Sequence, residues 1–294
     1  LWPFHSWAPI GYGAAPTAVA MVHAGVLKKF GIYSLIRIAV PLLPAGMQGW
    51  LHVIAFLCLG NILYCGLVAI RQKDLNLLIG NSSVAHMGFV FLGIAALNVI
   101  GITGAVVVMV AHGLLAALSF GISGYLCRQT QDPQMDRMAG MLSRLPFIGT
   151  ALIMALLAGC GLPGFGNFVG ELLVFFGAIK SFPVVTAFAL WGALVIGAVY
   201  MLRAVRTLMH GEVSETAKSI KDAETSWQRL PFVLLLGVLL LFGCFPGLLT
   251  DKIRPSVEAI LEQARQQGAP KMEGKAAFPL DDVPENIVNF DPIK

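Results

Sequence analysis

The sequence predicts an all-α protein that crosses a membrane several times. Its 294 residues are 57% hydrophobic and 12% charged, with a mean hydropathy of +0.77, whereas a soluble domain carries about 25% charged residues. The charged side chains gather in loops between apolar runs, and many runs reach the roughly 20 residues with which a helix spans a bilayer. A soluble domain is therefore excluded, because so few charges could not cover its surface.

Seven or eight apolar runs are candidates for spanning helices. The main predicted spans are residues 16–41, 50–70, 76–97, 100–126, 146–182, 184–208 and 230–249. Lys and Arg concentrate in alternate loops, while the loops at 42–49 and 97–100 contain none. Basic loops face the cytoplasm, so the net charge of +4 indicates membrane orientation rather than a nucleic-acid partner. The last span then delivers the chain to the opposite face.

The run at 146–182 is too long for one span and contains a helix-breaking sequence. Residues 159–167 (GCGLPGFGN) hold four glycines and a proline, which predict a break in the helix. A broken helix is tolerated at membrane depth where its freed backbone groups face protein or water. The sequence therefore predicts a polar cavity near this break, with a simple kink as the alternative.

Composition divides the chain into two regions. Residues 1–249 are the predicted transmembrane domain, and residues 250–294 are a predicted interfacial helix and polar tail. Apolar residues recur at helical spacing early in the second region: Ile253, Val257, Ile260 and Leu261. This pattern is typical of an amphipathic helix lying on a membrane surface. From Gln267 onward the chain is polar and contains Pro and Gly, which predicts an extended or docking tail.

Five ionisable residues lie near the middle of predicted spans: Lys28, Lys29, His86, His112 and Glu171. A charge at the centre of a membrane helix costs roughly 2.5–3.5 kcal/mol, so each needs a partner, a cavity or a function. Successive helical residues point about 100° apart. We therefore expect the two lysines to occupy different environments, and only one of them to be functional.

The residues at mid-depth predict a proton relay. Histidine exchanges protons near neutral pH because its unperturbed pKa is about 6.5, and Glu171 follows the helix break, the kind of place where transporters build ion sites. A lateral row of Lys29, His86, His112 and Glu171, bridged by water, would conduct protons along the membrane plane. His23 and Lys28 are secondary candidates. Structural hydrogen bonding by each histidine, and structural pairing of Glu171 with a lysine, are the alternatives.

No residue pattern in the sequence predicts a cofactor or metal bound by this chain. The five cysteines are scattered without a CxxC pair, so they indicate neither a metal site nor a disulfide framework. The glycines at 159–164 (GCGLPG) interrupt an apolar helical run and do not follow a strand, so they do not predict a dinucleotide site. Haem-ligand patterns are absent from the sequence. Any electron transfer linked to this chain must occur in other subunits.

Several segments resemble one family of membrane proteins. They are residues 1–9 (LWPFHSWAP), 15–17 (APT), 24–29 (AGVLKK), 83–88 (SVAHMG), 111–113 (AHG) and 161–171 (GLPGFGNFVGE). Over residues 1–260 or so, the chain resembles chain M, also called chain 4, of NADH:quinone oxidoreductase, respiratory complex I. Glu171 favours chain M over the similar chain L and the Mrp-type cation/proton antiporters, where the matching residue is a lysine.

The resemblance implies the carboxy-terminal part of an antiporter-like helix bundle made of inverted repeats. It implies proton translocation driven by quinone reduction elsewhere, with Lys29 as the connecting lysine, His86 and His112 as linking histidines, and Glu171 as the terminal charge. Quinone, FMN and iron–sulfur clusters are then expected in partner subunits, which include neighbouring antiporter-like chains. The implied location is the bacterial inner membrane. The enzyme class is a translocase without redox chemistry in this chain.

The chain also departs from the family pattern. His23 and Lys28 stand where the family has apolar residues, and residues 10–12 (IGY) replace an Asp-Ala-His stretch. We expect about five to seven further spans upstream, because the mid-membrane charges of this fragment need partners. The resemblance also implies a functional lysine just before Leu1, on a broken helix, with a glutamate two spans earlier. A cation/proton antiporter and a membrane-bound hydrogenase-type complex remain the alternative assemblies.

Overall fold

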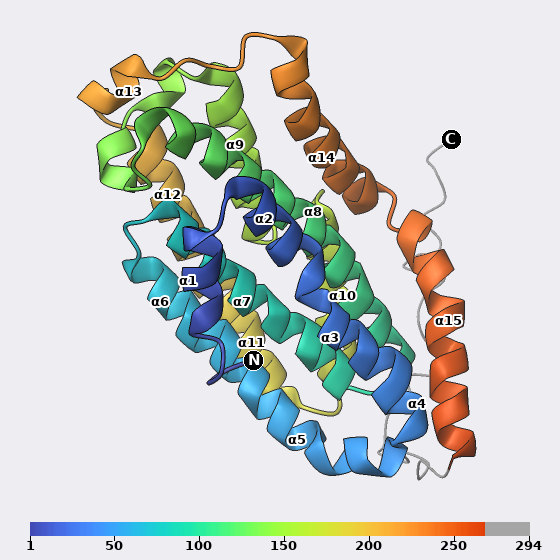
Figure 1. The fold of residues 1–294 in the computed structure, drawn as a ribbon. Helices are drawn as coiled ribbons and strands as arrows, with labels where there is room; N and C mark the ends of the chain where they lie inside the picture. Colours follow the sequence, from blue (N-terminus) through green and yellow to red (C-terminus); the bar gives the residue numbers. More distant parts are fainter. Residues whose placement is uncertain (268–294) are drawn as a thin grey trace.

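The computed structural model describes residues 1–267, and the regular elements in that part of the chain are helices (Figure 1). Two long helices, α7 (Leu75–Ala95) and α8 (Val99–Thr130), form the centre. Each begins at a side-chain cap, because Asp74 accepts a hydrogen bond from the N–H of Leu77 and Asn98 accepts one from Gly101. These caps satisfy backbone donors that would otherwise be free at the helix start.

The other helices surround this centre. In chain order they are α1 (Trp7–Ala14), α2 (Thr17–Val22), α3 (Lys29–Ser34), α4 (Val40–Leu42), α5 (Pro44–Gly60), α6 (Gly66–Arg71), α9 (Pro146–Gly159), α10 (Gly166–Ala178), α11 (Pro183–Trp191), α12 (Ala198–Met209), α13 (Glu215–Ser219), α14 (Ser226–Cys244) and α15 (Gly247–Gln266). Two short 3-10 turns lie between α8 and α9, η4 (Met135–Met138) and η5 (Met141–Ser143).

Four of the junctions between helices are π-helical turns rather than breaks. They are η1 (His23–Leu27), η2 (Leu35–Ala39), η3 (Asn61–Cys65) and η6 (Gly192–Gly197). Each joins neighbouring α-segments into one longer helix. A π turn closes i→i+5 hydrogen bonds and is frequent at functional sites. The sequence analysis did not predict these turns.

The predicted all-α membrane fold is confirmed. By length and composition, six helices in the described residues could cross a membrane: Thr17–Leu42, Pro44–Arg71, Leu75–Ala95, Val99–Thr130, Pro183–Met209 and Ser226–Cys244. A seventh is possible if the bent pair Met135–Ser143 and Pro146–Gly159 counts as one span. The predicted run 146–182 contains α9 and α10, which have 14 and 13 residues and are each too short to span alone.

The predicted break separates α9 from α10. The chain between them turns at Gly161 and Gly164, whose φ angles of 76° and 103° lie in the region that favours glycine. Gly243, near the end of α14, packs directly on the backbone of this turn, where any larger side chain would overlap Gly164. The end of α14 therefore lies beside the break.

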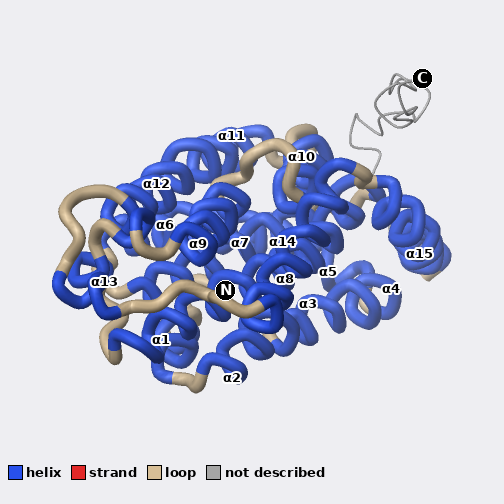
Figure 2. The backbone as a smooth tube through the Cα atoms, turned by 90° about the horizontal axis from the view of Figure 1, so that it is seen from above, coloured by secondary structure: helices blue, strands red, loops and turns tan. Residues whose placement is uncertain are grey.

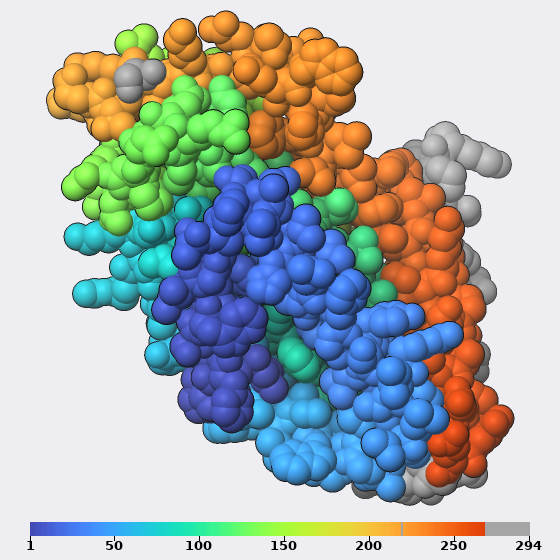
Figure 3. Space-filling view, in the orientation of Figure 1, coloured from blue at the N-terminus to red at the C-terminus, as the bar shows by residue number. Residues whose placement is uncertain are grey.

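α7 and α8 are enclosed by the rest of the bundle. α7 is buried over nearly its whole length, and α8 packs against α7, α10, α14, α15 and α2. Seen from above, α7 and α8 lie between α1, α2 and α3 on one side and α11 and α12 on the other (Figure 2). The space-filling view shows the first 40 residues, in blue, covering one face of the molecule (Figure 3). Polar groups on α7 and α8 therefore lie in the interior.

The basic loops gather at one end of the bundle, as the charge pattern predicts. The loop before α7 bonds to the loop after α8, since the N–H of Met135 donates to Lys73 O at 2.9 Å. The segment after α13 joins them, because Tyr125 donates to Lys221 O at 3.0 Å. Asp222 in this segment accepts hydrogen bonds from the first N–H groups of α9. Loops far apart in sequence thus form one layer.

The predicted amphipathic helix is present as α15, which begins at Gly247. Its apolar stripe faces the bundle, with Val257, Ile260 and Leu261 buried against the same cluster as Val40 and Ile102. The helix follows α14 and runs beside α4 and α8 (Figure 1). Its placement on a membrane surface stays a prediction. The predicted polar tail lies outside the described residues, apart from Gln267.

Candidate functional site

The five mid-membrane ionisable residues converge in the interior of the bundle. Lys29, His86, His112 and Glu171 are all buried, with exposed fractions of 6%, 2%, 2% and 6%. Lys28 is half-buried. They come from five elements, since Lys28 follows η1, Lys29 begins α3, and the others lie on α7, α8 and α10. The sequence predicted that these side chains would lie near one another only because each falls near the middle of its predicted span.

A close contact between two glycines brings Lys29 to His112. Gly25 of η1 and Gly113 of α8 face each other, and a Cβ added at Gly113 would lie 2.9 Å from Gly25 O. The Lys29 ammonium donates to the carbonyls of Ala24 and Gly25 at 3.0 and 2.6 Å. Its Nζ also lies 3.2 Å from His112 Nδ1. The two carbonyl oxygens accept hydrogen bonds from the buried Lys29 amine, and no carboxylate takes part.

Lys28 reaches the same histidine from the other side. Its Nζ donates to the carbonyl of Ser83 at 3.2 Å and also contacts the Ser83 hydroxyl, which lies 3.1 Å from His112 Nε2. The two lysines have different hydrogen-bond partners, as expected, but both side chains lie on paths to the same histidine. The N–H of Lys28 bonds to His23 O, an i→i−5 bond of the π turn, so the regular spacing of 100° per residue does not apply here.

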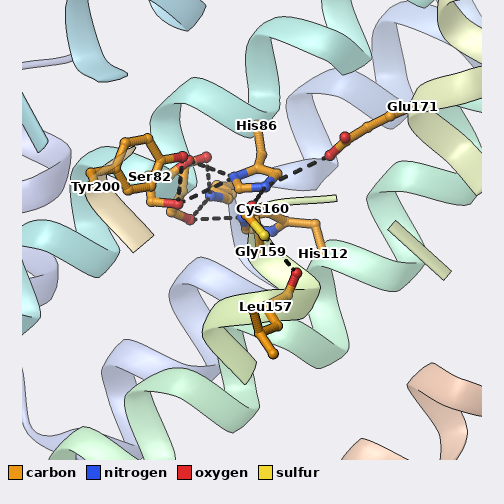
Figure 4. A network of polar contacts seen from close by, with 10 residues as sticks. Ser82, His86, His112, Leu157, Gly159, Cys160, Glu171 and Tyr200 are labelled. Carbon is orange, nitrogen blue, oxygen red and sulfur yellow. Dashed lines mark hydrogen bonds and ion pairs between the residues drawn. The ribbon is translucent and has the colours of Figure 1, made fainter. Parts of the chain in front are cut away.

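The two histidines link the lysines to the glutamate. The rings of His86 and His112 have centroids 5.2 Å apart. His86 Nδ1 lies 2.7 Å from Ser82 O, and its Nε2 lies 3.0 Å from Gly159 O, at the end of α9. Figure 4 shows Glu171 approaching His86 from the side opposite Ser82. His86 therefore joins the helix break to the centre of α7.

Glu171 completes the succession. Its Oε1 lies 3.7 Å from His86 Nε2, which is beyond hydrogen-bond distance but within reach of one bridging water. A cavity of about 10 Å³ lies beside both residues, and Cys160, Gly192 and Tyr200 also line it. That volume is close to the minimum that holds a water molecule. A small cavity therefore lies at the break, and its lining is mostly apolar, with His86, Glu171 and Tyr200 among the polar residues.

A tyrosine and two serines that the sequence analysis did not select also belong to this network. The Tyr200 hydroxyl lies 3.3 Å from Ser82 Oγ, which is 3.4 Å from His86 Nδ1. Ser83 separates Lys28 from His112. Serine and tyrosine carry no charge at neutral pH, so the cost of burying a charge did not mark them. The position of Ser82 and Ser83 one turn before His86 was the available signal for the two serines.

His23 does not join the network. Its ring packs against Tyr12 and Trp7 at centroid distances of 5.3 and 5.9 Å, and it lies on the side of Tyr12 rather than beside His112. The Tyr12 ring does lie 5.6 Å from the Lys28 ammonium, which is a cation–π distance. The imidazole of His23 therefore approaches the Lys28 ammonium through the Tyr12 ring.

This fold and site define an integral membrane protein with a chain of protonatable groups through its interior. Within residues 1–267, no cluster of His, Cys, Asp and Glu could hold a metal ion. No acidic side chain forms an ion pair with Lys28 or Lys29 in that part of the chain. The hydrogen-bond partners of the two lysines are carbonyl, hydroxyl and imidazole groups instead.

Comparison with known proteins identifies the family. Residues 1–197 match the transmembrane family described as NADH:quinone oxidoreductase/Mrp antiporter, so this chain belongs to that family. It is 34% identical over 260 residues to NADH-quinone oxidoreductase subunit M of Rickettsia prowazekii, covering 88% of this chain and 52% of the relative. It is 37% identical over 259 residues to subunit M of Pseudomonas aeruginosa, covering 88% and 50%. The chain thus spans about half the length of these relatives.

Solved structures share the fold. A chain of respiratory complex I from Thermus thermophilus with bound NADH has a TM-score of 0.82 at 29% identity, covering 90% of this chain and 56% of that chain. A chain of the Mrp complex from Dietzia has a TM-score of 0.81 at 18% identity, covering 92% and 58%. The second likeness concerns the fold alone. The resemblance to a complex I antiporter-like subunit, inferred from the sequence, is confirmed.

Proposed function

We propose that this chain is the carboxy-terminal part of a proton-translocating subunit of NADH:quinone oxidoreductase. The observation that carries the proposal is the continuous succession from Lys29 through His112 and His86 to Glu171. Its steps are 3.2 Å between Lys29 and His112, 5.2 Å between the imidazole centroids, and 3.7 Å from His86 to Glu171. Protons enter or leave at the two charged ends, and the histidines pass them on.

The curated relatives support the choice among the related assemblies. They are named as subunit M of NADH-quinone oxidoreductase, and a complex I chain matches at 29% identity. The partners of this chain are then other membrane subunits of the complex, with quinone, FMN and iron–sulfur clusters bound outside it. The membrane is the bacterial inner membrane, and α15 lies at its outer face. A cation/proton antiporter is the second candidate, since an Mrp complex shares the fold.

Proton pumping by the assembled complex tests this proposal. Glu171→Gln removes the terminal carboxylate with little change in shape, so we expect NADH-driven proton uptake into inverted vesicles to fall about tenfold or more. Lys29→Ala should also impair it. Matched controls are Glu258→Gln and Lys252→Ala on exposed positions of α15, which should pump normally. Normal pumping by Glu171→Gln in a fully assembled complex would refute the relay.

Copurification distinguishes the two assemblies. Affinity purification of the full-length protein from its own membrane, followed by mass spectrometry, should recover subunits carrying flavin and iron–sulfur clusters. Recovery of a complete multisubunit complex without any redox subunit would favour the antiporter.

A further inference from the structure

His112 is hydrogen-bonded at both of its ring nitrogens, each on the path to a different lysine. Nδ1 lies 3.2 Å from Lys29 Nζ, and Nε2 lies 3.1 Å from the Ser83 hydroxyl, which Lys28 contacts. Lys28, Ser83, His112 and Lys29 therefore form an unbroken line of hydrogen bonds. The relay described above uses only the Lys29 end of this line.

Counting donors and acceptors shows how many protons this line holds. A neutral imidazole has one N–H donor and one acceptor nitrogen, an ammonium has three donors and no acceptor, and a hydroxyl has one donor and can accept. If Lys28 is the ammonium, it donates to Ser83 Oγ, Ser83 donates to Nε2, and Nδ1–H donates to the lone pair of a neutral Lys29. Every hydrogen bond is then satisfied with one excess proton.

The same line is satisfied when the excess proton lies at the other end. Lys28 gives a proton to Ser83 Oγ, Ser83 gives its proton to Nε2 of His112, and Nδ1 gives its proton to Lys29. Lys28 becomes a neutral amine, Ser83 and His112 regain their formal states, and Lys29 becomes the ammonium. Its three donors match the three acceptors around it, the carbonyls of Ala24 and Gly25 and Nδ1.

We propose that Lys28 is a second proton-exchange residue that loads His112 through Ser83, in parallel with Lys29. This inference rests on the proposed function and adds a branch to it. The two lysines differ in access, because Lys29 is buried whereas Lys28 is half-buried beside the Tyr12 ring on the α1 side. Protons that reach His112 through Lys28 would therefore enter the protein at a different place from those that pass through Lys29.

A double-mutant cycle in the assembled complex tests the branch. Lys29→Ala should keep at least about a tenth of normal proton pumping, because His112 still receives protons from Lys28. Adding Lys28→Leu should lower the remainder about tenfold further, whereas Lys28→Leu alone should have a mild effect. This non-additive pattern is expected only when the two residues serve one acceptor. Abolished pumping in Lys29→Ala alone, or strictly additive effects, would overturn the proposal.

Two further variants separate proton exchange from a structural role. Arginine keeps the positive charge but stays protonated, so Lys28→Arg in the Lys29→Ala background should pump as poorly as Lys28→Leu. Ser83→Ala in that background should do the same, while Ser119→Ala, at a buried serine of α8, should match the parent. Full retention of pumping by Lys28→Arg in that background would assign Lys28 to charge or packing alone and overturn the branch.

The controls distinguish failure of the branch from failure of the relay. Electron transfer from NADH to quinone and the subunit content on native gels confirm assembly for each variant. If Glu171→Gln pumps normally, the proposed relay itself fails. If Glu171→Gln abolishes pumping while the Lys28 variants behave additively, the relay stands and only the Lys28 branch is rejected.

Discussion

The two buried histidines differ in what surrounds them. His112 lies between a hydroxyl and an amine, which can each donate or accept, so either neutral tautomer is satisfied. His86 lies between two carbonyl oxygens, those of Ser82 and Gly159, which only accept. A neutral imidazole has a single N–H, so it can bond to one of these oxygens, whereas the imidazolium can donate to both. The imidazolium form of His86 would thus find one carbonyl acceptor for each of its N–H groups.

Loss of either histidine should impair pumping less than loss of Glu171. Removing an imidazole leaves a space that water can enter, and water can carry protons across it. No such substitute exists for the terminal carboxylate. We expect His86→Ala and His112→Ala to retain measurable proton uptake in inverted vesicles under conditions where Glu171→Gln retains less. His52→Ala, at an exposed residue packed against Phe182, is the matched control. Abolished pumping in either single variant of an assembled complex contradicts this order.

The Tyr200 hydroxyl should contribute to stability more than to proton transfer. It is hydrogen-bonded to Ser82 Oγ at 3.3 Å. This contact lies beside the proposed proton route and is not one of its steps. Tyr200→Phe leaves the ring in place, so it should lower the free energy of unfolding by about 1 kcal/mol. Thermal melting in detergent measures the stability change, and proton uptake should stay above half of normal. A complete loss of proton uptake would instead make Tyr200 part of the route.

The candidate site was only partly predictable from the sequence. Lys29, His86, His112 and Glu171 could be selected because a charge or an imidazole in an apolar run is costly, and the structure brings them together. Their role in proton transfer stays a prediction. The contribution of Ser83 depends on how η1 turns Lys28 toward α7. That rotation comes from a π turn, and no residue pattern in His23–Leu27 distinguishes it from an ordinary helix.

At the scale of helices, close packing depends on small residues. α10 crosses α8 so closely that a Cβ at Gly104 would lie 2.7 Å from the backbone nitrogen of Val174. Such contacts let helix backbones approach each other in a membrane. They fix the depth of Glu171 relative to His112, because both residues lie on these two helices. The apolar runs predicted the helices themselves well, whereas the crossing points depend on which glycines face each other.

Two glycines of α14 provide a direct test of this packing. Gly243 abuts Gly164 at the break, whereas nothing lies within 4 Å of a Cβ built at Gly237. Gly243→Ala should therefore destabilise the protein by about 1–3 kcal/mol through overpacking. Gly237→Ala should be neutral or slightly stabilising, because alanine favours a helix. Thermal stability of the two variants, purified in parallel, measures the difference. Equal stability would mean that α14 does not seat against the break.

At the scale of the whole molecule, the basic layer sets orientation. The loops before α7, after α8 and after α12 bond to one another at one end of the bundle, and they carry most of the basic residues that lie between the spans. The loops at the other end, around residues 43, 96–98 and 179–182, carry one basic residue, Lys180. This difference between the two ends could be predicted from the sequence, because the charge of a loop is given by its own residues and does not depend on how the helices pack.

Labelling should place the two ends on opposite sides of the membrane. Cysteines introduced at the exposed Gln131 and Gln266 should react with an impermeant maleimide from the cytoplasmic and the outer side, respectively. The parent protein, with its five native cysteines, gives the background for each side. Labelling of both positions from one side only would contradict this topology.

The buried network also has a charge balance. It contains two amines, Lys28 and Lys29, and one carboxylic acid, Glu171. When the carboxylate is ionised, one ammonium makes the network electrically neutral, and that state matches the single excess proton on the line through His112. A second proton would leave a net charge in a low-dielectric interior, where an uncompensated charge is strongly unfavourable. Neutrality returns when a lysine releases a proton from the network, and proton uptake by Glu171 requires the same release for balance. Proton occupancy at the two ends of the network is thus linked by electroneutrality, without any movement of a helix.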